Sequence, residues 1–198
     1  MRLLGIDTDS KGCVALLDDQ AHTLDLYYIP TTESSRGRAA FDRAKLASYF
    51  RHIFTLPVDH VYFEEQWSRK DQSSVATFTF GDVYGSIIQA VESAAFYSNQ
   101  APEYHYVSGR EWKGKLGLSS HKGYAVQLAD KVFPGCVKGW EKASRQATRS
   151  GKYTSGAESA LLAFYGSVLQ RNRVRLPSNL DFYAKIELGK VVKNGADA

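Results

Sequence analysis

Short apolar runs separated by polar turns open the chain. Residues 3–6 are apolar and lead to Asp7, and a polar turn at 10–12 joins them to a second apolar run at 13–17. Residues 23–29 alternate between apolar and polar positions, as a strand with one buried face does. Runs of this kind joined by turn residues are typical of hairpins. These three segments are therefore expected to form an antiparallel meander.

Helical and strand-like patterns alternate along the rest of the chain. We expect strands over 60–63 and 103–107 and helices over 41–53, 73–97, 108–113, 121–133 and 155–169. The segments at 30–38 and 137–153 are polar loops, and 183–192 has strand-like character. A meander followed by strand–helix–strand crossovers predicts an α/β fold, with a mixed five-stranded sheet and helices on both faces.

Length and composition are those of an ordinary globular protein. With 198 residues, of which 43% are hydrophobic, the chain is long enough for one domain with a sizeable core. We expect that domain over 1–170 and a partly flexible C-terminal extension over 171–198. Two cysteines without ligand spacing indicate a reducing compartment. The absence of a bilayer-length apolar run or a leader predicts a cytoplasmic location, in a bacterial or phage-infected cell.

Positive charge is concentrated in one part of the chain. The net charge is only +4, but residues 110–152 carry ten Lys or Arg against three acids. This distribution permits a polyanionic partner without requiring one.

Three acidic positions are candidates for a metal site. Asp7 follows the first strand, Glu64 and Glu65 follow the fourth, and Glu158 lies one turn into the last clear helix. Each acid alone is typical of a turn, a strand end or a helix start. Adjacent central strands and a helix start would, however, bring them to one edge of the sheet. Mg²⁺ prefers such oxygen ligands, and two ions can promote phosphodiester hydrolysis.

Motifs around these acids resemble those of the RuvC-type Holliday junction resolvases, most closely the phage-encoded and organellar branches. The ordered set comprises Gly5–Asp9 with Gly12, Asp59–Glu64, Phe78–Gly85, Trp112–Lys113 with Leu116–Leu118, Lys122, Leu128–Ala129 with Phe133–Pro134, and Gly156–Leu162. Each motif is weak by itself, but their order along residues 2–169 is fairly specific.

The resemblance implies an RNase H-like fold, a homodimer, dependence on Mg²⁺ or Mn²⁺, and paired nicks in four-way DNA junctions. It implies Asp7, Glu64 and Glu158 as metal-binding catalytic acids, although a Glu–Gln match in some members favours Glu65 over Glu64. Many members place a further Asp or His one turn before the last acid.

That fourth position departs from the family pattern. Residues Tyr153, Thr154 and Ser155 occupy the region here. Either three acids suffice, or a displaced group such as Asp9 contributes, or a second metal is held weakly.

Basic and aromatic side chains near the expected acidic edge are candidates for DNA binding. They are Trp67, Arg69, Lys70, Lys113, Lys115 and Lys122. Lys113 and Lys122 match lysines that the family uses near the scissile phosphate, and Lys122 is also a catalytic candidate. A solvated basic face is the usual alternative for lysines, and core packing is the usual alternative for Trp67. If exposed, Trp67 could stack on an unpaired base.

Gly81 and Gly85 lie four residues apart in the expected helix at 73–97. Their missing side chains fit either tight packing on the sheet or a helix pair across a dimer interface.

Two other functions remain compatible with the sequence. One is a branched-DNA-binding protein with little or no cleavage, and the other is a nuclease of the same fold that cuts RNA–DNA hybrids. An actin-like ATPase or sugar kinase also opens with a strand, an Asp and a Gly turn, but this chain is short for two lobes and lacks a second phosphate loop.

Overall fold

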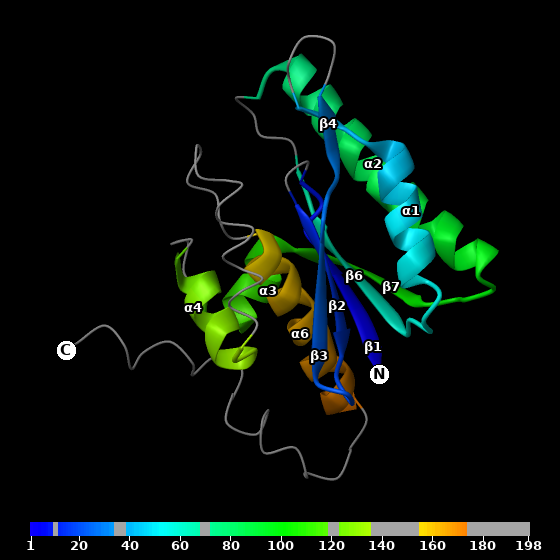
Figure 1. Cartoon of the computed structure of the whole chain (residues 1–198). Coiled ribbons are helices and arrows are strands. Elements are labelled where there is room, and N and C mark those ends of the chain that lie inside the picture. Colours follow the sequence, from blue (N-terminus) through cyan, green and yellow to red (C-terminus); the bar gives the residue numbers. More distant parts are fainter. Residues whose placement is uncertain (10–11, 34–38, 68–71, 119–122, 136–154, 174–198) are drawn as a thin grey trace.

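A mixed five-stranded sheet forms the centre of the molecule. The computed structural model describes residues 1–9, 12–33, 39–67, 72–118, 123–135 and 155–173 (Figure 1). The sheet has the order β3-β2-β1-β6-β7 and contains β1 (Arg2–Ile6), β2 (Cys13–Asp18), β3 (Thr23–Tyr28), β6 (His60–Glu65) and β7 (Glu103–Ser108). The first three strands are antiparallel, whereas β6 and β7 run parallel to β1. This arrangement confirms the predicted α/β fold with a mixed five-stranded sheet.

Helices cover both faces of this sheet, as expected from the crossovers. One face carries α1 (Arg43–Ile53) and α2 (Ser74–Tyr97), and the other carries α3 (Gly109–Lys115), α4 (Gly123–Val132) and α6 (Ser155–Arg173) (Figure 1). Among the described residues, no helix has the length and apolar character needed to cross a membrane. Because α6 continues to Arg173, it crosses the predicted domain boundary at residue 170. The strand expected over 183–192 and the loop at 137–153 lie outside the described residues.

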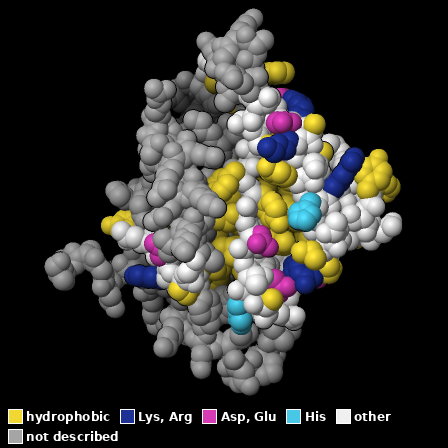
Figure 2. Space-filling model, viewed as in Figure 1, with side chains coloured by type: hydrophobic (Ala, Val, Ile, Leu, Met, Phe, Trp, Pro, Cys, Tyr) yellow, Lys and Arg dark blue, Asp and Glu magenta, His cyan; other side chains and the backbone are white. Residues whose placement is uncertain are grey.

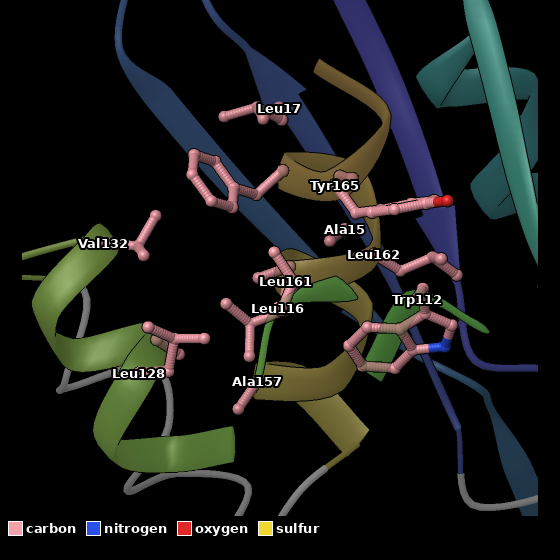
Figure 3. Close-up of a cluster of buried hydrophobic side chains, with 14 of the residues drawn as sticks. Ala15, Leu17, Trp112, Leu116, Leu128, Val132, Ala157, Leu161, Leu162 and Tyr165 are labelled. Atoms are coloured by element: carbon pink, nitrogen blue, oxygen red, sulfur yellow. The ribbon is translucent and has the colours of Figure 1, made fainter. Parts of the chain in front are cut away.

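Alternate residues of β1 supply two hydrophobic cores. Leu3 packs with α3, α4 and α6, in the core that contains Trp112, Leu161 and Tyr165 (Figure 3). Leu4 and Ile6 pack on the opposite side, with α1 and α2. This division follows from the alternation of side chains along a strand.

Gly5 permits α6 to lie close to the centre of the sheet. A Cβ at this position would collide with the Ser159 carbonyl oxygen and would meet the Ala163 backbone nitrogen at 2.5 Å. The glycine therefore allows the first turns of α6, which carry Glu158, to rest directly against β1.

The segment before α1 differs from the sequence expectation. β4 (Thr31–Glu33) and β5 (Ala39–Phe41) form a two-stranded antiparallel sheet where a polar loop and a helix start were predicted. Asp42 begins α1 because its Oδ1 accepts a hydrogen bond from the Lys45 backbone N–H at 2.9 Å, which leaves Phe41 outside the helix. Strands of three residues are too short for alternation to distinguish them from a loop.

Candidate active site

Asp7 and Glu64 lie side by side at the carboxyl-terminal ends of β1 and β6, two neighbouring inner strands of the sheet. β1 and β6 are parallel and in register, with Ile6 opposite Phe63, so the next residue of each chain segment is an acid. Asp7 and Glu64 are only 8% and 7% exposed. Two carboxylates that are this buried require compensation by a cation or by hydrogen bonds.

The backbone of Asp7 is fixed by the hairpin and by α6. Its N–H donates to the Cys13 carbonyl at 3.0 Å and lies 3.3 Å from the Ser159 hydroxyl oxygen. The Ser159 hydroxyl in turn lies 2.7 Å from the Cys13 carbonyl and 2.8 Å from the Ser155 carbonyl, to which it donates. The Asp9 backbone N–H donates to Asp7 Oδ1 at 3.3 Å.

Glu64 is held between β1 and the start of α3. The Thr8 hydroxyl donates to the Glu64 carbonyl at 2.8 Å and joins the ends of the two strands. Gly109 begins α3 directly beside the Glu64 carboxylate, and a Cβ there would collide with Oε1. Glu65 lies on the other face of the strand, where its charge raises the pKa of Tyr84 in α2 after the larger effect of burial.

Lys113 connects Glu64 with Glu158. Its Nζ lies 3.3 Å from Glu64 Oε1 and 3.0 Å from Glu158 Oε2. Glu158 enters from the first turn of α6, and Lys113 comes from α3. Lys113, for which the sequence predicts a contact with DNA, is paired with two of the three candidate acids in this structure.

The charges of the site are only partly balanced. Burial raises the pKa of Asp7 well above its usual range, and the charges of Glu64 and Glu158 raise it further. Burial also raises the pKa of Glu64, an effect that Lys113 opposes and Glu158 reinforces. For Lys113, burial lowers the pKa, but the charges of Glu64 and Glu158 outweigh burial and raise it. The site therefore favours an additional positive charge.

Trp112 contributes a polar atom to the same region. Its indole Nε1 is buried and has no hydrogen-bond partner of good geometry among the described residues. The indole N–H of Trp112 nevertheless favours the ionised form of Glu64 and so lowers the pKa of that carboxyl.

The three acids approach one another less closely than the ligands of a single ion would. In the part of the chain that the structure describes, the one trio of possible ligand atoms within 4.8 Å of one another is His60, Glu103 and His105, at the opposite end of β6 and β7. In the acidic site, the Lys113 ammonium group lies between Glu64 and Glu158.

The remaining DNA-binding candidates fall into two groups. Trp67 is 75% exposed just after β6, so core packing is excluded, and Lys115 is exposed at the end of α3. Arg69, Lys70 and Lys122 lie outside the described residues, as do Tyr153 and Thr154. On the face shown in Figure 2, acidic and basic side chains of the described residues are interspersed instead of forming a patch of one sign.

Gly81 and Gly85 lie on the outer face of α2. A Cβ at either position would have no atom within 4 Å, so the glycines do not serve tight packing on the sheet. Phe78 and Phe96 are exposed at helical spacing on the same face. An exposed face with large apolar side chains and small residues between them is typical of an interaction surface.

Sequence reasoning overlooked two residues that shape the site. Gly109 leaves room for the Glu64 carboxylate, and Ser159 joins α6 to the β1–β2 hairpin. Ser159 follows Glu158 directly, and a serine in an otherwise apolar helix was the available signal. Gly109 gave no signal, because a glycine after a strand is equally typical of a turn.

Comparisons with known proteins find similarity only at the level of structure. Neither a family model nor a curated protein matches the sequence. A structure of Thermus thermophilus RuvC superposes with a TM-score of 0.49 at 13% identity, covering 86% of this chain and 97% of that chain. A structure of T. thermophilus RuvC in complex with a Holliday junction substrate gives a TM-score of 0.49 at 12% identity, covering 87% and 96%. Both are structures of the family that the sequence motifs resemble.

Proposed function

We propose that this protein is a metal-dependent, structure-selective DNA endonuclease that resolves four-way junctions by paired nicks. The observation that carries the proposal is the convergence of Asp7, Glu64 and Glu158, whose charges act on one another, with Lys113 paired to Glu64 and Glu158. Two acids come from the ends of adjacent parallel strands and the third from a helix start, so all three are held on rigid elements.

The donor set fits Mg²⁺, with Mn²⁺ as a substitute. Hard divalent cations prefer carboxylate oxygens, and the site offers three carboxylates against one lysine. The raised pKa values of Asp7 and Glu64 express the cost of holding these negative charges in a buried place. Binding of a divalent cation by Asp7, Glu64 and Glu158 would remove that cost.

Bound metal ions would supply an activated water and stabilise the leaving oxygen of the phosphodiester. Asp7, Glu64 and Glu158 would hold these ions at the site of cleavage. Lys113, relieved of its carboxylate partners, would offer its ammonium group to the same phosphate. Lys122 is a further candidate for this role from the sequence.

The DNA would be held by groups around the same edge. Trp67 is free of core packing and could stack on a base at the junction centre. Lys115, with Arg69, Lys70 and Lys122, would contact phosphates, and such contacts make binding sensitive to salt. A homodimer through the α2 face that carries Gly81 and Gly85 would present two acidic sites to the two strands that must be cut.

A cleavage assay on a panel of substrates tests this function. Synthetic four-way junctions, the matching linear duplex and an RNA–DNA hybrid are incubated with the protein in Mg²⁺, Mn²⁺ or EDTA. We expect symmetric nicks in the junction alone, dependent on metal, abolished by Asp7→Asn and retained by the control Asp25→Asn, an exposed acid on β3. Cleavage by Asp7→Asn at the wild-type rate would refute the assignment of the site.

The same panel separates the two competing functions. Tight junction binding in a gel shift without nicks in either metal would favour a branched-DNA-binding protein. Preferential cleavage of the RNA strand in the hybrid would favour the other class of nuclease.

A further inference from the structure

A second group of metal-ligating side chains lies at the opposite end of the sheet from the acids. His60 begins β6, and Glu103 and His105 lie at the start of β7. The parallel register pairs His60 with Glu103 and Tyr62 with His105, so all three side chains project from the same face of the sheet. Glu64 is four residues further along β6, or about 13 Å away at 3.3 Å per residue. This group is therefore separate from the acidic site.

The spacing of the three side chains matches that of ligands around one small ion. His60 Nδ1 lies 3.3 Å from His105 Nε2 and 3.4 Å from Glu103 Oε2. His105 Nε2 lies 3.6 Å from Glu103 Oε1. Ligands that are about 2.0–2.1 Å from a tetrahedral Zn²⁺ are separated from one another by about 3.3–3.4 Å. The three side chains thus already stand close to the positions that a tetrahedral ion requires.

Neighbouring side chains hold the histidines in this arrangement. The Tyr62 ring stacks on His105 with a centroid distance of 4.3 Å and an interplanar angle of 13°. Gln170 of α6 donates from Nε2 to the Tyr62 hydroxyl at 2.9 Å and thereby helps to fix the ring that stacks on His105.

The group is also accessible to an ion. The side chains of His60 and His105 are each 16% exposed, whereas that of Glu103 is 57% exposed. Glu103 therefore lies at the mouth of the site, with the two imidazoles behind it. Three protein ligands leave a fourth position for water.

We propose that His60, Glu103 and His105 bind a transition-metal ion of the Zn²⁺ class. Two imidazole nitrogens and one carboxylate suit Zn²⁺, whereas Mg²⁺ prefers oxygen ligands only. The ion joins the edge strand β7 to β6, and because it binds the folded chain it raises the stability of that edge. The competing account is a hydrogen-bonded histidine pair beside a glutamate, with no metal.

Metal titration of the full chain tests the proposal independently of nuclease activity. Protein treated with EDTA and exchanged into chelator-free buffer is titrated with Zn²⁺ by calorimetry, with and without excess Mg²⁺, and with Co²⁺ by visible absorption. We expect one Zn²⁺ equivalent per chain that Mg²⁺ does not displace. The Co²⁺ complex is expected to show the absorption of a tetrahedral ion.

Single-ligand variants then assign the binding. His60→Gln and Glu103→Gln are each expected to weaken Zn²⁺ binding by about 10-fold or more. Two control variants, His52→Gln on the exposed face of α1 and Asp7→Asn in the acidic site, are expected to leave it unchanged. Glu103→Gln alters an exposed side chain, so its far-UV spectrum should match that of wild type.

Two results would overturn the proposal. The first is a wild-type chain that binds no stoichiometric Zn²⁺, which would leave the hydrogen-bonded pair as the account of this cluster. The second is binding that persists in both His60→Gln and Glu103→Gln, which would place the ion elsewhere.

Discussion

Lys113 sets the electrostatic state of the acidic site at the scale of single residues. Its ammonium group contacts Glu64 and Glu158 and lies 5.0 Å from the centroid of the neighbouring Trp112 ring. Without this positive charge, three carboxylates would lie in one largely buried site. The positive charge of Lys113 therefore stabilises the metal-free protein, because it balances part of the negative charge that a divalent cation would otherwise have to balance.

Replacement of Lys113 by Met should destabilise the metal-free protein. Removal of one partner of a buried ion pair typically costs 3–5 kcal/mol, and we expect about 2 kcal/mol here because the Lys113 side chain is 30% exposed. Urea unfolding in EDTA at neutral pH measures this loss, and Mg²⁺ should recover much of it. Lys115→Met, which alters an exposed lysine of the same helix, should change stability by less than about 0.5 kcal/mol. Equal stabilities of the two variants would contradict the role of the ion pairs.

Asp7→Asn should stabilise the metal-free protein in a pH-dependent manner. The pKa of Asp7 is higher in the folded than in the unfolded chain, so its favourable contribution is complete below the ordinary carboxyl pKa of about 4. That contribution is lost as the pH rises through the raised pKa. At neutral pH the free energy of unfolding of the variant should therefore exceed that of wild type by about 1 kcal/mol. A gain of this size is typical when a substitution removes an unfavourable interaction from a functional site.

Urea unfolding at a series of pH values in EDTA measures the difference between Asp7→Asn and wild type. The difference should shrink as the pH falls through the raised pKa of Asp7 and vanish below about 4, where Asp7 is protonated in both states. Mg²⁺ should raise the stability of wild type and leave that of the variant almost unchanged. A difference that does not vary with pH would show that Asp7 is not held at a raised pKa.

Gly109→Ala should impair cleavage without unfolding the protein. The added Cβ collides with Glu64 Oε1, so the carboxylate must move, and displacements of about 1 Å can cost about 100-fold in rate. We expect at least about a 10-fold loss of junction nicking, measured in single turnover. Gly114→Ala is the matched control, because a Cβ at that position of α3 meets no atom within 4 Å. A similar loss in both variants would indicate an effect on α3 as a whole.

The residues of the site differed in how readily the sequence revealed them. Asp7, Glu64 and Glu158 could be found because each follows an apolar run or interrupts an apolar helix. The contact of Lys113 with two of them could not, since it depends on how α3 packs against α6. The cluster of His60, Glu103 and His105 could not be found either. His60 and His105 are 45 residues apart in the sequence, and only the parallel pairing of β6 and β7 brings the three side chains together.

At the scale of elements, α2 has two faces of different character. Val83, Ile87 and Val91 are buried against the sheet and α1, whereas the glycines and Phe78 lie on the outer side. α2 was predictable because its helical periodicity extends over many residues, and β6 because its apolar run ends in two acids. β4 and β5 were not, since three-residue strands are stabilised mainly by the partner strand.

Gly85→Leu tests whether the outer face of α2 forms a dimer interface. The leucine meets no atom within 4 Å of its Cβ in the single chain, and it should favour the helix by up to about 1 kcal/mol. The variant should therefore fold normally but block close approach of a second α2, and light scattering should report monomers. Gly114→Leu, at an open glycine of α3, should remain dimeric. A dimeric Gly85→Leu variant would exclude this interface.

At the scale of the whole molecule, the proposed function requires one acidic site for each of the two strands that are cut. Every described residue of the acidic site belongs to one chain, so each protomer of a dimer would carry a complete set of acids. Heterodimers of wild type and Asp7→Asn, prepared by coexpression with two affinity tags, should then nick one strand only. On a supercoiled plasmid that extrudes a cruciform, wild type should yield linear DNA and the heterodimer nicked circles, resolved by agarose electrophoresis. Linear DNA from the heterodimer would mean that one site cuts both strands, and no product at all would mean that neither site works without the other.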